Sequence, residues 1–189
     1  MSASDTELVQ QSLTAPQAFS ELFRRHSGAV YGYVARRAGR DVADEVLSET
    51  FLVAFERRDR FRSDATSARP WLLGIATNVV HAYRRKEARH LHLLQQLQEP
   101  VLGDGGIPRA GDRMDAAARL RDLGDRIRNL PAGDRDVLLL HAWADLTAEQ
   151  IAVALDIPVG TVWSRLNRVR RTLRDAAGTA GKEHPAWTS

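Results

Sequence analysis

Cysteine is absent from the sequence, and no apolar run approaches the ~18 residues that a membrane-spanning helix needs. The first absence excludes disulfide scaffolds, cysteine nucleophiles and thiolate metal sites, and it suits a reducing compartment. The second argues against insertion into a membrane. The amino-terminal stretch MSASDTELVQQ is acidic and polar, and it lacks the pattern of a secretion signal. We therefore expect a cytoplasmic protein.

Lysine is also scarce. Only Lys86 and Lys182 are lysines among the 27 basic residues, and the others are arginines. The formal net charge is only +3, although the pI is about 9.8. Arginine presents a planar fork of donors that suits phosphate groups and guanine edges. A GC-rich genome would explain the number of arginines, so only their positions bear on function.

Alternation of apolar and polar residues is rare, and apolar residues instead recur every three or four positions. This pattern predicts an all-α protein. A stretch rich in glycine and proline, 99–112 (EPVLGDGGIPRAGD), interrupts the helical pattern. We interpret 97–112 as a flexible linker between two small helical domains, 15–96 and 113–175. Residues 176–189 are expected to form a disordered tail.

Motifs of catalysis and of metal binding are missing. The sequence holds no GxxxxGK[ST], no GxSxG and no HExxH. His90 and His92 stand two positions apart in a predicted helix, so they do not share a face. We expect no enzymatic activity, no catalytic residue, no metal site and no cofactor.

The amino-terminal domain is predicted to contain three or four helices. A capping-box pattern at Thr14–Gln17 is expected to begin the first, with Phe23 on its buried side. Asp41 is expected to cap the second helix, and Pro70 to open the third. Between these two helices, 57–69 is predicted to be a polar loop.

The carboxyl-terminal domain contains a helix-turn-helix pattern. Thr147–Gln150 form a second capping box, with Leu146 and Ile151 at the positions of a hydrophobic staple. The short helix is expected to end near Leu155, and a longer amphipathic helix follows it. One face of that helix is predicted to be apolar, formed by Val162, Leu166, Val169 and Leu173.

Arginines occupy the other face of this last helix. Between Thr161 and Arg174 there are five arginines and no acid. A helix that is apolar on one side and cationic on the other fits the DNA major groove, where its first residues meet base edges and later arginines meet phosphates. The alternative is a solvated arginine-rich helix in an ordinary bundle. The candidate contact residues are Thr161, Trp163, Ser164, Arg165, Asn167, Arg168 and Arg171.

Two parts of the chain resemble a known family, the extracytoplasmic-function (ECF) sigma factors of the sigma-70 family. Leu130–Arg174 is similar to region four of these proteins, above all in IPVGTVWSRL at Ile157–Leu166. Three other stretches resemble region two, namely FSELFRRH (19–26), DVADEVLSETFLVAFER (41–57) and PWLLGIATNVVHAYRRK (70–86). Two matches in this order across a linker are more specific than a helix-turn-helix alone.

The resemblance implies a role in transcription initiation. Region four of the family reads the minus-thirty-five promoter element, and region two reads the minus-ten element and binds core RNA polymerase. The chain departs from the family at Trp163, where lysine is frequent, and at Ala82, where aspartate or asparagine is frequent. Local contacts must differ at both positions. By resemblance, the linker passes through polymerase toward the RNA exit path, and the alternative is a plain tether.

The resemblance also implies partners. An acidic stripe on the second helix would dock on the clamp helices of the beta-prime subunit, although a solvated acidic face is an equal alternative. Region four would contact the beta flap. An anti-sigma factor would hold the free chain off polymerase, and we expect the free chain to hide its basic faces. The acidic stripe consists of Asp41, Asp44, Glu45 and Glu49.

Promoter melting requires unpaired bases to be held outside the stack by a pocket. By resemblance, the loop before the third helix and the start of that helix would do this. Trp71 is interpreted as a core residue rather than a stacking platform. The basic run at the end of the third helix suits the DNA backbone or the helix terminus. The candidate minus-ten residues are Phe61, Arg62, Asp64, Asn78, Arg84, Arg85 and Lys86.

Two other functions fit parts of the pattern. A helix-turn-helix repressor or activator would bind palindromic duplex DNA as a dimer and without polymerase. A helical interaction protein would use the basic faces to bind acidic partners and would show no promoter preference.

Overall fold

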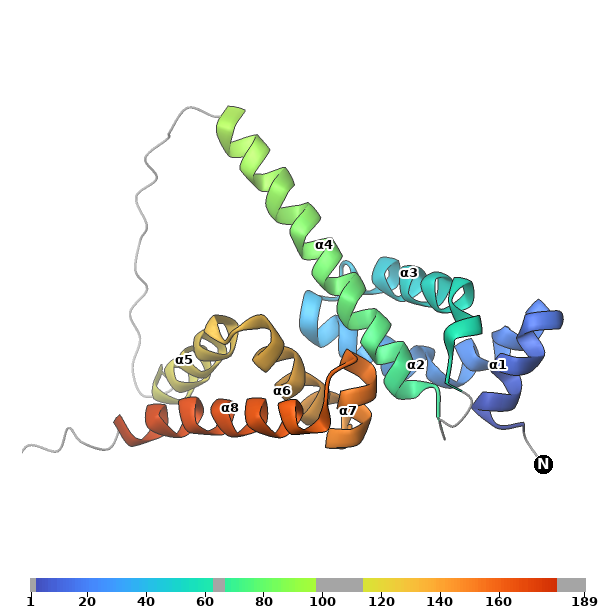
Figure 1. Ribbon diagram of the computed structural model, residues 1–189. Helices are drawn as coiled ribbons and strands as arrows, with labels where there is room; N and C mark the ends of the chain where they lie inside the picture. Colours follow the sequence, from blue (N-terminus) through green and yellow to red (C-terminus); the bar gives the residue numbers. More distant parts are fainter. Residues whose placement is uncertain (1–2, 63–66, 98–113, 180–189) are drawn as a thin grey trace, which may run out of the picture.

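The computed structural model describes residues 3–62, 67–97 and 114–179 (Figure 1). All regular elements in these ranges are helices, which confirms the all-α prediction. None of them combines the length and apolarity of a membrane span. Most of the expected linker and the end of the expected tail lie outside the described residues. The helices are α1 (Asp5–Thr14), α2 (Phe19–Ala38), α3 (Ala43–Glu56), α4 (Arg69–Leu97), α5 (Met114–Asn129), α6 (Ala132–Ala144), α7 (Ala148–Leu155) and α8 (Val159–Thr179), with 3-10 turns at Pro16–Ala18 and Arg58–Arg60.

Helix α1 precedes the first helix that the sequence pattern predicted. A capping box begins it: Ser4 Oγ accepts a hydrogen bond from the Glu7 amide (3.2 Å), and Glu7 Oε2 accepts one from the Ser4 amide (2.7 Å). The capping box predicted at Thr14–Gln17 is wrong, because Pro16–Ala18 forms a 3-10 turn without a side-chain cap. Pro16 has no amide hydrogen to donate and fixes its own backbone, which favours this tight turn.

Asp5 fastens α1 to the rest of the chain. Its Oδ2 accepts a hydrogen bond from the Ala68 amide (2.8 Å) and lies 2.8 Å from Nε2 of His26. Arg25 lies 3.2 Å from Oδ1. These contacts join α1, α2 and the start of α4, so the amino-terminal helical body begins before residue 15.

Helices α2, α3 and α4 pack against one another. Two details of the prediction are wrong here. Asp41 does not cap α3, whose N-cap is Val42 and has no side-chain hydrogen bond. Phe23 is 45% exposed, because it stands one position beyond the buried Leu22 and therefore points about 100° away from it. Its ring packs edge-to-face with the ring of Phe51, at 4.8 Å between centroids.

The helix-turn-helix of the sequence prediction is present as α7 and α8. Thr147 Oγ1 accepts from the Gln150 amide (3.3 Å), and Gln150 Oε1 accepts from the Thr147 amide (3.0 Å), which confirms the second capping box. Leu146 and Ile151 are both buried, as the staple requires. Helix α7 ends at Leu155, and its C-cap, Asp156, adopts the left-handed conformation (φ 52°) and turns the chain toward α8.

We call α1–α4 the N-terminal module and α5–α8 the C-terminal module. In this structure the two modules pack against each other: α7 lies on the N-terminal half of α4, and α6 touches α2 (Figure 1). Most of their buried apolar residues form one continuous cluster. Gly74 of α4 meets the carbonyl group of Ala154 so closely that a Cβ at position 74 would overlap the oxygen. Glycine is therefore required at this crossing.

Candidate nucleic-acid interface

Helix α8 has two different faces. Val162, Leu166 and Val169 are buried beneath it, where α8 packs against α6 and α7. Trp163 is 48% exposed on the other side. Thr161 is half-buried, and the remaining exposed candidates on this side are Ser164, Asn167, Arg168 and Arg171. The helix therefore offers a polar and cationic surface to solvent from a rigid base.

Two arginines of α8 are oriented by the N-terminus of α6. The half-buried Arg165 lies with Nη1 3.4 Å from the carbonyl oxygen of Gly133. Arg168 Nη1 lies 3.4 Å from Oδ2 of Asp134, a residue that is only 2% exposed. The sequence analysis found no acid between Thr161 and Arg174 and therefore did not identify this partner. An acid 34 positions before the arginine leaves no local signal, since only the tertiary contact joins them.

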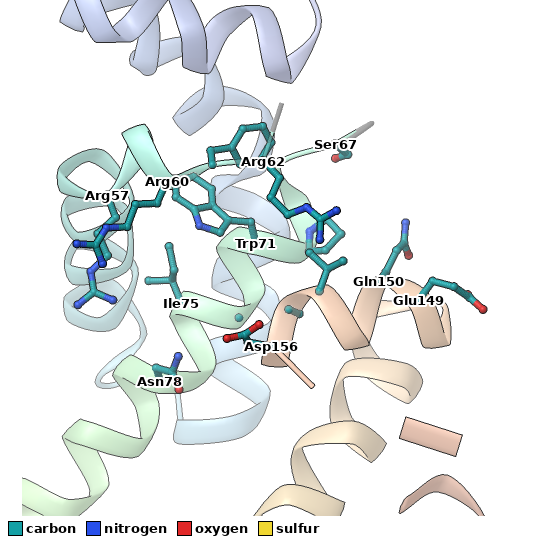
Figure 2. Close-up of a pocket in the computed structure, with 15 residues that line it drawn as sticks. Arg57, Arg60, Arg62, Ser67, Trp71, Ile75, Asn78, Glu149, Gln150 and Asp156 are labelled. Atoms are coloured by element: carbon teal, nitrogen blue, oxygen red, sulfur yellow. The ribbon is translucent and has the colours of Figure 1, made fainter. Parts of the chain in front are cut away.

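Several minus-ten candidates meet at one cavity. Phe61 is buried, and its ring packs edge-on against Trp71 at 5.2 Å between centroids. Trp71 is half-buried and packs against the core, in line with its interpretation as a core residue, but it also borders a cavity of about 520 Å³. Arg62 and Asn78 border the same cavity and are exposed (Figure 2). Asp64 lies outside the described residues.

The walls of this cavity come from both modules (Figure 2). Arg57 and Arg60 add positive charge to the N-terminal wall, although the sequence prediction did not include them. Their signal was available, because both stand in the basic stretch RRDRFR that holds Phe61. The opposite wall belongs to α7 and the turn after it: Glu149, Gln150, Val153, Ala154 and Asp156.

The basic run at Arg84, Arg85 and Lys86 is not part of this cavity. All three residues are exposed further along α4. Arg84 also donates to the carbonyl oxygen of Arg37. Burial lowers the pKa of Arg84, and the positive charges of Arg37 and Arg135 lower it further. Arg84 therefore stands partly in the junction between the modules, whereas Lys86 faces solvent.

The acidic stripe, formed by Asp41 just before α3 and by three acids on α3, is an exposed surface. Asp41, Asp44, Glu45 and Glu49 are all exposed, and none forms an ion pair with another described residue. The stripe is therefore available to a basic partner.

The expectation that the free chain hides its basic faces is wrong. The cationic face of α8 and the basic run of α4 are open to solvent. The surface that is covered carries aromatic and polar residues, and α7 covers it. Across the described part of the chain, no group of three or more His, Asp or Glu side chains is placed to hold a metal ion.

Comparisons with known families and proteins agree with this geometry. The family model for Sigma-70 region 2 matches residues 22–90, and the model for Sigma-70, region 4 matches residues 120–173. The ECF RNA polymerase sigma-E factor of Haemophilus influenzae is 28% identical over 185 residues, which cover 89% of this chain and 91% of the relative. The ECF RNA polymerase sigma factor SigL of Mycobacterium tuberculosis is 29% identical over 154 residues, covering 81% and 85%.

Two solved structures share the fold. CnrH, in complex with the cytosolic domain of CnrY, superposes with a TM-score of 0.63 at 23% identity and covers 94% of this chain and 99% of its own. The sigma factor RpoE of Bartonella quintana, in complex with the anti-sigma factor NepR, superposes with a TM-score of 0.58 at 19% identity and covers 83% and 94%. With both sigma-70 regions matched in order along one chain, the protein belongs to the extracytoplasmic-function group of the sigma-70 family.

Proposed function

We propose that this sigma factor reads the minus-thirty-five element with α8 and the minus-ten element with the surface between Phe61 and Asn78, and that it thereby directs core RNA polymerase to promoters. The observation that carries the proposal is the division of α8: an apolar face anchored in the helix-turn-helix core and an exposed face rich in arginine. The chemistry of RNA synthesis belongs to the polymerase, so the chain itself has no catalytic role. It works in the cytoplasm, alongside the polymerase.

The minus-thirty-five contacts divide along α8. Trp163, Ser164 and Asn167 are exposed in its first turns and are assigned to base edges, together with Thr161. Arg165 and Arg168 are assigned to base edges or nearby phosphates, because α6 holds each in a defined direction. Arg171, further along the exposed face, is assigned to the phosphate backbone.

The minus-ten contacts are assigned to the N-terminal wall of the 520 Å³ cavity. Asn78 offers both a donor and an acceptor to a base edge, and the rings of Phe61 and Trp71 offer an apolar surface to an unstacked base. Arg62 lies at the same wall. Asp64 keeps its assignment to the same element from the family resemblance. Arg84, Arg85 and Lys86 are assigned to the backbone that follows.

Partners follow from the exposed surfaces. The acidic stripe of α3 suits the basic clamp helices of the beta-prime subunit, since opposite charges speed and orient docking. The C-terminal module is assigned to the beta flap. RpoE was solved in complex with the anti-sigma factor NepR, and we assign an anti-sigma factor to this chain as well. Phe23 and Leu52, which are 45% and 51% exposed on α2 and α3, offer it apolar contacts.

Reconstitution tests this function. Core polymerase with the purified chain should yield discrete run-off transcripts from genomic fragments, and polymerase alone should not. Arg168→Ala should weaken binding of the holoenzyme to the mapped promoter by about 10- to 100-fold if the side chain reads a base. Arg126→Ala on α5 removes an arginine of similar charge, paired with Asp122, and serves as the control. Tight palindromic binding without polymerase, and no polymerase-dependent initiation, would favour the repressor alternative instead.

A further inference from the structure

A second cavity, of about 210 Å³, lies where α2 and α4 of the N-terminal module meet α6 of the C-terminal module. One water molecule requires only ~15 Å³ of such space, so the cavity has room for a small solute. Within the described part of the chain no acid lines it, and four of its six lining residues are arginines. These residues are Arg37, His81, Arg84, Arg85, Ala88 and Arg135.

Positive charge exceeds negative charge around this cavity. Among the described residues, two acids act on its arginines. Asp136 of α6 pairs with Arg37, and Glu87 acts on Arg84 from the next turn of α4. Asp136 has a further neighbour, because each of its carboxylate oxygens lies 3.0 Å from Nε2 of His81. Four arginines therefore stand against two carboxylates, an excess of two positive charges before any proton on His81 is counted.

Like charges crowd Arg84. Its guanidinium group donates a hydrogen bond to the carbonyl oxygen of Arg37. Burial lowers the pKa of Arg84, and the positive charges of Arg37 and Arg135 lower it further. Arginine nevertheless keeps its proton in proteins. The repulsion among these three side chains therefore remains in the fold, and an anion placed among them would relieve it.

Two of the guanidinium groups have a donor without a partner. Arg37 is only 5% exposed, and its Nη atoms donate to Tyr33 and Asp136, but its buried Nε has no acceptor among the described residues. Nε of Arg135 is also buried and has none, although Nη1 of the same side chain donates to the carbonyl oxygen of Arg128 (2.7 Å). Buried donors are almost always paired in folded proteins, and an unpaired one commonly marks the place of a water molecule or an ion.

We propose that this cavity binds the terminal phosphate of a small phosphorylated molecule, and that the bound anion bridges α6 to α2 and α4. Guanidinium groups present paired donors that match phosphate oxygens. A terminal phosphate carries about 1.5 to 2 negative charges near neutral pH, which matches the excess of positive charge. A phosphate within a DNA strand carries one charge and is flanked by two sugars, so it fits this cavity less well. The site goes beyond the proposed function, which assigns Arg84 and Arg85 to the DNA backbone.

Titration calorimetry of the full chain tests the site, with inorganic phosphate and ATP as probes and adenosine as the neutral control. Ionic strength is held constant with potassium chloride, because exposed arginines attract any anion at low salt. Phosphate and ATP should each bind saturably at one site, and adenosine should give no heat. Heat that does not saturate, or that chloride reproduces, would overturn the proposal.

Arginine variants test the location of the site. Arg135→Gln on α6 and Arg85→Gln on α4 each remove a charged donor and should weaken phosphate binding by about 10- to 100-fold. Arg24→Gln removes the same charge from α2, where Arg24 is exposed and pairs with Glu21, and should leave the Kd unchanged. Circular dichroism checks that each variant is folded. Equal losses in all three variants, or no loss in the two cavity variants, would show that phosphate binds elsewhere or without a defined site.

Hydrogen exchange tests the bridge. Saturating phosphate should slow the exchange of amides near Arg135 on α6 as well as those near Arg37 on α2 and Arg84 on α4, because a ligand held by all three helices stabilises them together. Slowing on α4 alone would overturn the bridge.

A single-stranded oligonucleotide without terminal phosphates separates the two sources of phosphate. Arg135→Gln should change its Kd by less than about twofold. If the oligonucleotide loses as much affinity as phosphate does, the cavity belongs to the DNA backbone and the proposal falls. A chain that binds no phosphate but supports polymerase-dependent initiation overturns the anion site and leaves the sigma function intact.

Discussion

The two surfaces assigned to DNA differ in what surrounds them. On α8 the exposed face carries arginines, Ser164 and Asn167, and nothing in the described part of the chain covers it. On α4 the face around Trp71 and Phe61 is aromatic, and α7 lies over it. The first surface suits intact duplex DNA, and the second suits bases that have left the duplex.

This difference has a physical origin. Charged and amide side chains are well solvated, so a duplex-reading helix stays exposed at little cost. A surface that holds unstacked bases needs apolar rings, and water penalises their exposure. The wall of α7 that faces this surface is mostly polar and leaves a cavity in front of it, so Trp71 stays half-buried rather than fully covered. The surface that we assign to the minus-ten element is thus partly enclosed, whereas the one assigned to the minus-thirty-five element is open.

The largest expected effect is the loss of Phe61. Phe61→Ala removes a buried ring from the N-terminal module and should lower the free energy of unfolding by about 3–5 kcal/mol, the range for such truncations. Urea unfolding followed by circular dichroism measures this. A change below about 1 kcal/mol would show that the ring is not part of the core. The aromatic surface near α4 would then not be anchored in the core, and its contrast with the exposed cationic surface of α8 would not hold.

Substitutions at two neighbouring residues of α8 should affect different properties, one the stability of the fold and the other the binding of promoter DNA. Val162→Ala deletes part of a fully buried side chain and should cost about 2 kcal/mol of stability. Trp163→Ala, one position later and 48% exposed, should change stability by no more than about 0.5 kcal/mol and should weaken promoter binding. Unfolding curves and binding titrations on the same two proteins provide the comparison. If Trp163→Ala unfolds the helix while Val162→Ala does not, then α8 does not bury the face that carries Val162.

A substitution at Asp134 tests whether this residue positions Arg168 of α8. Asp134→Asn removes the negative charge beside Arg168 while keeping the shape of the side chain. Arg168 then loses its orienting partner and the chain gains positive charge, so binding to random DNA should strengthen and the ratio of promoter to random binding should fall several-fold. Titrations against both DNAs at matched salt measure the ratio. An unchanged ratio would mean that Asp134 does not position Arg168 for reading bases.

The smallest expected effect is the pH dependence of the stability of α1 in the N-terminal module. Burial tends to raise the pKa of Asp5, but the hydrogen bond from Ala68 and the charge of His26 outweigh it, and the pKa lies below its ordinary 3.8. A carboxyl group with a lowered pKa stabilises the folded state above its unfolded pKa, and this stabilisation is lost as the pH falls through the folded value. Protection of α1 amides from hydrogen exchange should therefore be constant near neutral pH and decrease below about pH 4. Asp5→Asn should lose this dependence.

Local signals account for much of the fold. The Thr147 capping box, the staple and the apolar stripe of α8 were predicted from short-range patterns, and short-range contacts form them. Helix α1 was missed although Ser4 and Glu7 carry a capping-box signal, because few apolar residues follow it. The Thr14–Gln17 pattern predicted a capping box that does not form, because Pro16 begins a 3-10 turn there.

The candidate site was harder to predict. Patterns identified residues that suit DNA, and Arg62 and Asn78 do meet at one cavity. No pattern indicated that α7 forms the opposite wall, or that Arg37 pairs with a residue 99 positions away. Such contacts depend on the shapes of two assembled modules. Periodicity within one helix carries no information about them.

Helix α7 has two neighbours at once. It packs against α4 of the N-terminal module and, through the turn at Asp156, against α8 of its own. A displacement of α7 from α4 would carry α8 with it, so the position of the helix assigned to the minus-thirty-five element and access to the surface assigned to the minus-ten element would change together. By thermodynamic reciprocity, any ligand that prefers α8 in its displaced position also favours exposure of α4 by the same factor. If both assignments hold, occupancy of the α8 surface and access to the α4 surface are thermodynamically linked.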